Sequence, residues 1–223
     1  MKLIQKITFI IIFLSLNVNA FAAVSGFVDS KQVTQRRPMG VDFNSNGTKM
    51  FVVGTVENKI FEFDLTTGFD VSTATKNSNV CDFVGLGSDV VDIEFNSDGT
   101  KLFLVDQGGD DAIEEFDLST AYDVSSCTHV EEHFAGDFEL VGIEFNPSGT
   151  KLFIYDTTGT DKIKQYSLNS PYNLSNLTLQ KQSTGTSDKT FLDIEDDPMG
   201  FTFSSDGSKT VSYTHLTLPT TVR

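Results

Sequence analysis

Short apolar segments alternate with glycine-containing polar turns along most of the chain. In residues 91–118, for example, Asn96-Ser97-Asp98-Gly99 separates two apolar segments. Asp-Gly and Asn-Gly pairs tolerate the positive φ angles that tight hairpins require. Beyond the first 22 residues, no segment repeats apolar positions at helical spacing over ten or more residues. The pattern therefore predicts an all-β protein.

This pattern recurs three times in full and once in part. Its turn glycines lie 52, 50 and 58 residues apart, at Gly47, Gly99, Gly149 and, in a weaker copy, Gly207. Two further blocks follow in the same order in each full copy, and they begin at Ile60, Ile113 and Ile163 and at Phe69, Tyr122 and Tyr172. Self-similarity at such a period indicates an architecture built from one repeated supersecondary unit.

Each repeat is predicted to form four strands, of which the second is the most apolar. Residues 102–105 read Leu-Phe-Leu-Val without alternation, so both faces of this strand should be buried. Four-stranded units of this length favour a β-propeller over a β-solenoid or separate hairpins. We predict blades at about 38–88, 89–138 and 139–196 and part of another at 197–210, which makes a truncated propeller.

The hairpin sequence resembles that of known propeller families. Residues 95–103 read Phe-Asn-Ser-Asp-Gly-Thr-Lys-Leu-Phe and are similar to the repeats of TolB-like, YVTN and lactonase-type β-propellers. The resemblance extends over residues 38–210. The chain lacks the Trp-Asp and Gly-His pairs of WD repeats and the spacing of an Asp-box, and it has no Trp for quinoprotein docking motifs. The resemblance implies a propeller fold, but many functions share this hairpin.

Both ends of the chain are predicted to lie outside the fold. Lys2 and Lys6 precede a ten-residue apolar segment and small-residue exits at Ala20 and Ala22, which is typical of a secretory signal peptide over residues 1–22. The apolar segment is too short for a membrane-spanning helix. Residues 211–220 resemble a translated sequencing adapter, so residues 211–223 are predicted to be a non-native tail and 23–210 the propeller. We expect a bacterial protein exported to the periplasm, the cell surface or the medium.

The strong negative charge limits the choice of partners. Asp and Glu number 31 against 16 Lys and Arg, which makes a formal net charge of −15. Such a surface repels nucleic acid and anionic lipid. We expect a protein, glycan or small-molecule ligand, with no nucleic acid and no membrane span after signal cleavage.

An acidic, glycine-containing loop is the candidate metal site. Asp106, Asp110 and Asp111 could ligate calcium, although their spacing differs from that of a calcium loop, so a solvated turn is favoured. No other cofactor is predicted. His129 and His133 fit an H-x-x-E-H zinc motif, but on the predicted strand they would lie roughly 13 Å apart. We therefore interpret that motif as a chance match.

The two cysteines are on the predicted outer strands of neighbouring blades. Cys81 and Cys127 are not equivalent positions of the repeat. An oxidising compartment would allow a disulfide between them. Two separate thiols are the favoured interpretation, and the disulfide is the alternative.

No catalytic residues are predicted, because the chain has no nucleophile elbow, phosphate loop or Ser-His-Asp set. The favoured function is an exported, non-catalytic binding or interaction module, since function on a propeller lies in variable loops. One alternative is a lactonase-like hydrolase with metal or carboxylates at the axial mouth. For that site Asp106 and Asp156 are equivalent positions, but Gly54 leaves the ring incomplete. Another alternative is a structural component of a surface or appendage.

Overall fold

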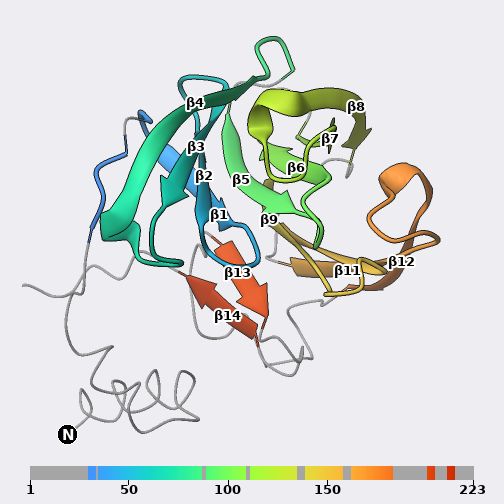
Figure 1. The fold of residues 1–223 in the computed structure, drawn as a ribbon. Coiled ribbons are helices and arrows are strands. Elements are labelled where there is room, and N and C mark those ends of the chain that lie inside the picture. The colour runs from blue at the N-terminus through green and yellow to red at the C-terminus, as the bar shows by residue number, and fades with distance from the viewer. Residues whose placement is uncertain are drawn as a thin grey trace, which may run out of the picture.

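The computed structural model describes residues 30–33, 35–86, 89–108, 111–134, 139–157, 162–182, 200–203 and 210–213. Over these residues the chain forms three four-stranded antiparallel sheets and one two-stranded sheet (Figure 1). The prediction of an all-β propeller is confirmed, with three full blades and two strands of a fourth. The predicted signal peptide lies outside the described residues. Among the described residues, no helix has the length and apolar character needed to cross a membrane.

Each blade is a meander whose strands pair in sequence order. Blade 1 consists of β1 (Pro38–Phe43), β2 (Lys49–Gly54), β3 (Lys59–Leu65) and β4 (Ala74–Asp82). Blade 2 consists of β5 (Val90–Phe95), β6 (Lys101–Asp106), β7 (Ala112–Leu118) and β8 (Cys127–Phe134). Blade 3 consists of β9 (Leu140–Phe145), β10 (Lys151–Asp156), β11 (Lys162–Leu168) and β12 (Leu177–Gln182). Short 3-10 helices precede the outermost strands: η1 (Val71–Thr73), η2 (Val124–Ser126) and η3 (Leu174–Asn176).

The fourth sheet pairs β13 (Gly200–Phe203) with β14 (Thr210–Tyr213). β14 therefore includes residues 211–213 of the predicted non-native tail, which pair with residues 200–202 of β13. The remainder of that tail lies outside the described residues, and its origin stays a prediction.

The turn glycine and the aromatic block of each repeat are in contact, which explains why they recur together. Gly99 has a φ of +72°, which a side chain rarely adopts. A Cβ added there would lie 2.3 Å from the ring of Tyr122. Phe69 and Tyr172 contact Gly47 and Gly149 in the same way. The hairpin between the first two strands is thus packed against the loop that leads to the fourth.

The hydrophobic core lies mainly between blades. Side chains of β6 alternate between two cores, with Leu102 and Leu104 facing blade 1 and Phe103 and Val105 facing blade 3. The core between blades 1 and 2 includes Phe51, Val53, Ile60, Cys81, Phe83, Val90, Ile93, Phe95, Phe116, Leu118 and Val124. The core between blades 2 and 3 includes Ile113, Leu140, Ile143, Phe145, Leu152, Ile154, Leu168, Tyr172 and Leu174. The continuous apolar strand is therefore buried on both faces, as predicted.

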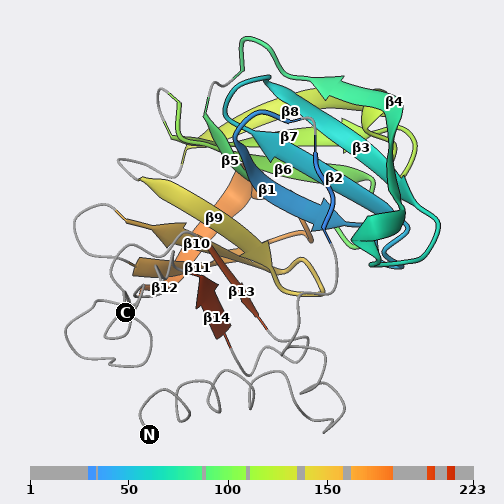
Figure 2. The same cartoon turned by 90° about the vertical axis from the view of Figure 1, so that its left-hand side faces the viewer.

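The first strands of successive blades gather around a common axis. β1 packs against β5, β5 against β9 and β9 against β13. Figures 1 and 2 show these strands towards the middle of the fold and β4, β8 and β12 towards its outside. Residues that are one repeat apart in sequence consequently become neighbours near the axis.

Candidate functional site

Four carboxylates from three blades converge near the axis, and we call them the axial carboxylate cluster. They are Asp42 on β1, Asp92 and Glu94 on β5, and Glu144 on β9, and all four are partly buried. Asp42, Glu94 and Glu144 occupy the same position of the repeat, directly before the Phe-Asn pair of the hairpin. Sequence reasoning missed the cluster, although an acid at the same position of the first strand in each of the three full blades was the signal that could have revealed it.

The cluster forms because each carboxylate accepts hydrogen bonds from the next blade. Asp42 Oδ2 accepts from the Phe95 amide at 3.0 Å, and Glu94 accepts from the Phe145 amide. The first strand of a blade has a free edge, and its buried N–H groups need partners. The acidic side chains supply those partners and bind adjacent blades together beside the axis.

Asp92 differs from the other three because glycine occupies its position in the other repeats. Its Oδ2 accepts from the Ile143 amide at 3.0 Å, which links blade 2 to blade 3. A Cβ on Gly142 would lie 3.1 Å from that oxygen, and one on Gly40 would lie 3.0 Å from the Asp92 backbone. The flanking glycines therefore make room for a single carboxylate at this level of the axis.

Burial and mutual repulsion raise the pKa values of the cluster. Burial raises the pKa of Asp92 to about 7, and the charge of Asp42 adds to the effect against two backbone hydrogen bonds. Burial likewise raises the pKa of Glu144 to about 7, and the charges of Asp92 and Asp42 raise it further against hydrogen bonds from Thr202 and Phe203.

The pKa values of Asp42 and Glu94, the other two members of the cluster, are also raised. Burial raises the pKa of Asp42 to about 6, opposed by hydrogen bonds from the Phe43 and Phe95 amides. Burial, and then the charges of Asp42 and Glu144, raise the pKa of Glu94 well above its ordinary value. At neutral pH the cluster thus combines ionised and protonated carboxyl groups, as acid–base chemistry requires.

The predicted calcium loop is described only in part. The Asp106 carboxylate is buried, and its Oδ1 accepts from the Asp89 and Gly108 amides, both at 3.0 Å. Asp111 has a φ of +40°, whereas Asp110 lies outside the described residues. Asp106 therefore holds the loop backbone together, and calcium binding stays a prediction. The equivalent Asp156 is also buried, and it forms an ion pair with Lys164 at 3.0 Å.

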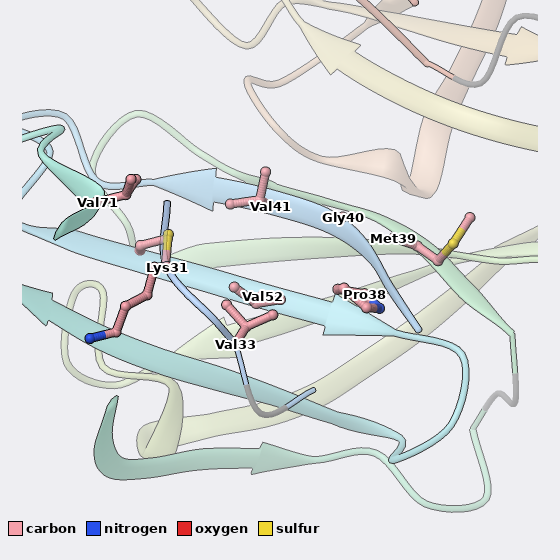
Figure 3. A pocket seen from close by; sticks show the side chains of 9 residues that line it. Lys31, Val33, Pro38, Met39, Gly40, Val41, Val52 and Val71 are labelled. Carbon is pink, nitrogen blue, oxygen red and sulfur yellow. The ribbon is translucent and has the colours of Figure 1, made fainter. Parts of the chain in front are cut away.

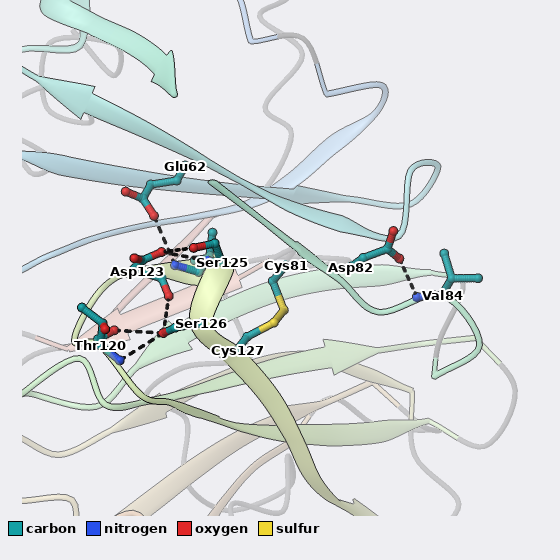
Figure 4. Close-up of a disulfide and its surroundings, with 10 residues drawn as sticks. Glu62, Cys81, Asp82, Val84, Thr120, Asp123, Ser125, Ser126 and Cys127 are labelled. Carbon is teal, nitrogen blue, oxygen red and sulfur yellow. Dashed lines mark hydrogen bonds between the residues drawn. A yellow bond between two sulfur atoms is a disulfide. The ribbon is translucent and has the colours of Figure 1, made fainter. Parts of the chain in front are cut away.

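Cys81 and Cys127 form a disulfide between blade 1 and blade 2 (Figure 4). Their Cα atoms are 5.9 Å apart. The structure thus has the bridged alternative and not two separate thiols. An irregularity in the β3–β4 register, between Phe61 and Phe63, precedes the pairing of Cys81 with Ile60. Blades 2 and 3 have an irregularity at the equivalent place, before Phe116 and Tyr166. The cysteines meet because Cys81 lies near the end of β4 and Cys127 at the start of β8 of the next blade, and an alignment of the blades does not show that these two non-equivalent positions are neighbours.

The H-x-x-E-H segment lies on a strand, β8, where one metal cannot bind both histidines. An irregularity in the β7–β8 register pairs His129 with Phe116 and His133 with Ile113. Phe116 and Ile113 belong to the cores on opposite faces of blade 2. Each imidazole has a different glutamate partner on β7.

A pocket of about 290 Å³ lies on blade 1 (Figure 3). Apart from Lys31 its lining is apolar: Val33, Pro38, Met39, Gly40, Val41, Met50, Val52 and Val71. It offers no carboxylate or imidazole, so the axial carboxylate cluster is the better candidate for chemistry.

The fold and the axial carboxylate cluster define a β-propeller with an acidic centre, and solved structures share this fold. No protein-family model and no curated protein sequence matches the chain. Among solved structures it is similar to a protein from Lactobacillus plantarum at 16% identity and a TM-score of 0.56, over 81% of this chain and 48% of that one.

Two further neighbours carry a functional name. The "putative 6-phosphogluconolactonase" of Bacteroides fragilis is 16% identical, with a TM-score of 0.55, over 78% of this chain and 47% of that chain. The protein of the same name from Bacteroides uniformis is 14% identical, with a TM-score of 0.51, over 78% of this chain and 46% of that chain. The chain thus spans about half the length of these 6-phosphogluconolactonase-like propeller proteins. The TolB-like and YVTN resemblances are not tested by these matches.

These names correct the favoured functional prediction. A non-catalytic binding module was expected, but the neighbours with a functional name are named as lactonases, which agrees with the hydrolase alternative. The expectation failed because it relied on the absence of catalytic motifs within the sequence. Carboxylates contributed one by one from successive blades form no such motif.

Proposed function

We propose that this chain is part of an exported lactone hydrolase of the β-propeller type and that the axial carboxylate cluster activates water. The observation that carries the proposal is the convergence of four carboxyl groups from three blades beside the axis, where burial raises the pKa of both Asp92 and Glu144 to about 7. A carboxylate with this pKa is a stronger base than an ordinary one and is still partly ionised at neutral pH. The names of the structural neighbours support the lactone as the substrate class.

The proposed mechanism divides two roles among neighbouring carboxyl groups. Asp92 or Glu144, when ionised, accepts a proton from water as the water oxygen attacks the lactone carbonyl carbon. Glu94, whose pKa burial and the neighbouring charges raise well above its ordinary value, donates a proton to the ring oxygen as the ester bond breaks. Environments that separate the pKa values of adjacent carboxyls are how one site obtains both an acid and a base.

The charge of the protein favours an uncharged substrate. The net charge is −15, and the cluster consists of acids alone. A phosphorylated lactone would be repelled from this site, whereas a neutral sugar lactone would not. Export is supported by the disulfide, since such bonds persist in oxidising compartments.

The test is a lactone hydrolysis assay with the full chain. Gluconolactone and its 6-phosphate serve as substrates, and the release of protons measures the rate. We expect Asp92→Asn and Glu144→Gln to lower kcat/KM by about 100-fold or more. The control Asp64→Asn changes an exposed carboxylate on β3 and should leave the rate unchanged. For the unsubstituted chain, the rate should rise with pH to a plateau above about 7, because the ionised form is the base. A rate equal to the uncatalysed background, or full activity in both axial variants, would contradict the proposal.

A further inference from the structure

Three side chains at the outer part of blade 2 form a second group of potential ligands, far from the axial strands in the sheet order. They are Glu115 on β7 and Glu131 and His133 on β8, and we call them the rim cluster. One nitrogen or oxygen atom from each lies within 4.8 Å of the others. Glu115 pairs with Glu131 and Ile113 with His133, so all three side chains are on the face that packs against blade 3.

The distances within the rim cluster suit a small metal ion. His133 Nε2 is 3.2 Å from Glu115 Oε2 and 3.5 Å from Glu131 Oε1. Zinc bonds of about 2.0–2.1 Å in a tetrahedron separate ligand atoms by roughly 3.3 Å. The three atoms could therefore bind one such ion after small side-chain adjustments, without movement of the strands.

Neighbouring groups hold two of the ligands in position. Lys101 Nζ contacts Glu115 Oε1 at 2.6 Å, which leaves Oε2 on the side of His133. Ser175 on η3 of blade 3 donates to Glu131 Oε1 at 2.7 Å. Such outer partners fix ligand orientation in metal sites. The side chains of Glu115 and His133 are only 4% and 9% exposed, whereas that of Glu131 is 44% exposed and gives solvent access.

The sheet also places like charges opposite each other, which independently indicates a cation. Glu115 lies opposite Glu131, and the adjacent Glu114 lies opposite Glu132. Like charges in directly opposed positions destabilise a sheet. Glu114 and Glu132 lie on the opposite face of the sheet, where His129 pairs with Glu114. On the face of the rim cluster Lys101 pairs with Glu115, and its second partner is a further acid, Asp117. A divalent cation at the rim cluster would offset the repulsion between Glu115 and Glu131.

We propose that the rim cluster is a zinc site, with His133 Nε2 and one carboxylate oxygen each from Glu115 and Glu131 as ligands. Water completes the fourth position, and Ser175 holds Glu131 from blade 3. The imidazole nitrogen favours zinc over calcium, which prefers six to eight oxygen ligands. Because Ser175 belongs to blade 3, the ion would stabilise the contact between blades 2 and 3. This site is independent of the proposed hydrolase activity.

The experiment is equilibrium dialysis of the untagged full chain against ZnCl₂ in excess calcium, which saturates sites made of carboxylates alone. Bound zinc is measured by mass spectrometry, and zinc should also raise the melting temperature. We expect one zinc per chain, with affinity reduced more than about tenfold in His133→Gln and Glu131→Gln. The matched control is His129→Gln, which changes the other histidine of β8 on the opposite face and should bind zinc normally.

The variants separate the outcomes. Glu131 is the most exposed ligand, so Glu131→Gln should stay folded even if His133→Gln does not, and circular dichroism checks this. Zinc binding lost in the rim variants and kept in His129→Gln supports the site. No bound zinc in the unsubstituted chain, equal binding in Glu131→Gln, or an equal loss in His129→Gln overturns it.

Discussion

The seam between blades 1 and 2 and the seam between blades 2 and 3 are formed by the same repeat but are closed differently at the rim. At the first seam Cys81, opposite Ile60, is bonded to Cys127 of the next blade. At the second seam the position opposite Ile113 is His133, within the rim cluster. Equivalent positions thus carry a covalent link in one seam and a polar group in the other.

The interiors of the two seams are alike. Phe51 and Phe95 have ring centroids 4.4 Å apart, and the equivalent Phe103 and Phe145 are 4.8 Å apart. Tyrosines from the following loop pack against both pairs. The repeat therefore specifies the buried interior of each seam. The rim varies between the seams because partly exposed positions tolerate more substitutions.

Of the changes to the two seams, breaking the covalent link should lower the free energy of unfolding the most. Reduction of the Cys81–Cys127 bond, which joins residues 46 apart, should lower the free energy of unfolding by about 4 kcal/mol through the entropy of the unfolded chain. Denaturant unfolding with and without reductant measures this. The double variant Cys81→Ala/Cys127→Ala should not respond to reductant. An unchanged midpoint after reduction confirmed by mass would refute the stabilising role.

Cavities in the two interiors should have nearly equal effects. Leu102 and Leu152 are equivalent, fully buried residues of the first and second seam. Replacing either with Ala should lower the free energy of unfolding by about 3 kcal/mol, measured by denaturant unfolding of the oxidised protein. A difference above about 1.5 kcal/mol between the two variants would show that the interiors are not equivalent.

The contributions of the two axial ends to stability should change with pH over different ranges, because Asp42 links blades 1 and 2 and Asp92 links blades 2 and 3. The folded-state pKa values of Asp42 and Asp92, about 6 and about 7, lie above the ordinary 3.8. The folded state therefore binds protons more tightly than the unfolded state, so these groups favour folding at low pH, and stability falls as pH rises through this window.

Substitution of each acid tests that sign. Asp92→Asn should remove the decline between about pH 4 and 7 and stabilise the protein by about 1–2 kcal/mol at pH 8, relative to the unsubstituted chain. Asp42→Asn should have a smaller effect that ends near pH 6. Urea unfolding at a series of pH values provides the measurement. Greater stability together with lost hydrolysis in Asp92→Asn would be a trade-off between stability and activity. A stability that rises with pH in this window would contradict the assignment.

The smallest expected effect is at the polar rim. Ser175→Ala removes the hydrogen bond from blade 3 to Glu131 and should cost about 0.5 kcal/mol without zinc, because the site is exposed. Asn79→Ala is its counterpart at the first seam, where the Asn79 amide donates to Asp123 of blade 2 at 3.0 Å. Thermal unfolding of both variants compares the two rims. A cost of several kcal/mol for Ser175→Ala would show that the rim of the second seam is more rigid than we infer.

The sequence predicted the fold well because the repeat carries it in local signals. Gly99 and its equivalents mark the hairpins, and the continuous apolar strand at 102–105 indicates burial on both faces. Both signals depend on neighbouring residues of the chain, and they recur often enough to reveal the number of strands in each blade.

The candidate sites could not be derived in the same way. Asp42 and Glu144 are the only cluster members in their repeats, and they join Asp92 and Glu94 only where the first strands meet at the axis. The disulfide depends on the β3–β4 register and the rim cluster on the β7–β8 register.

Short-range pattern and composition were enough to predict the all-β class, the repeat, the hairpins and the net negative charge. The carboxylates that share the axis, the contact between Cys81 and Cys127, and the placement of His133 beside two glutamates with His129 on the other face became visible only in the folded chain. These contacts join residues from different strands or blades, so strand register and blade packing set the distances between them.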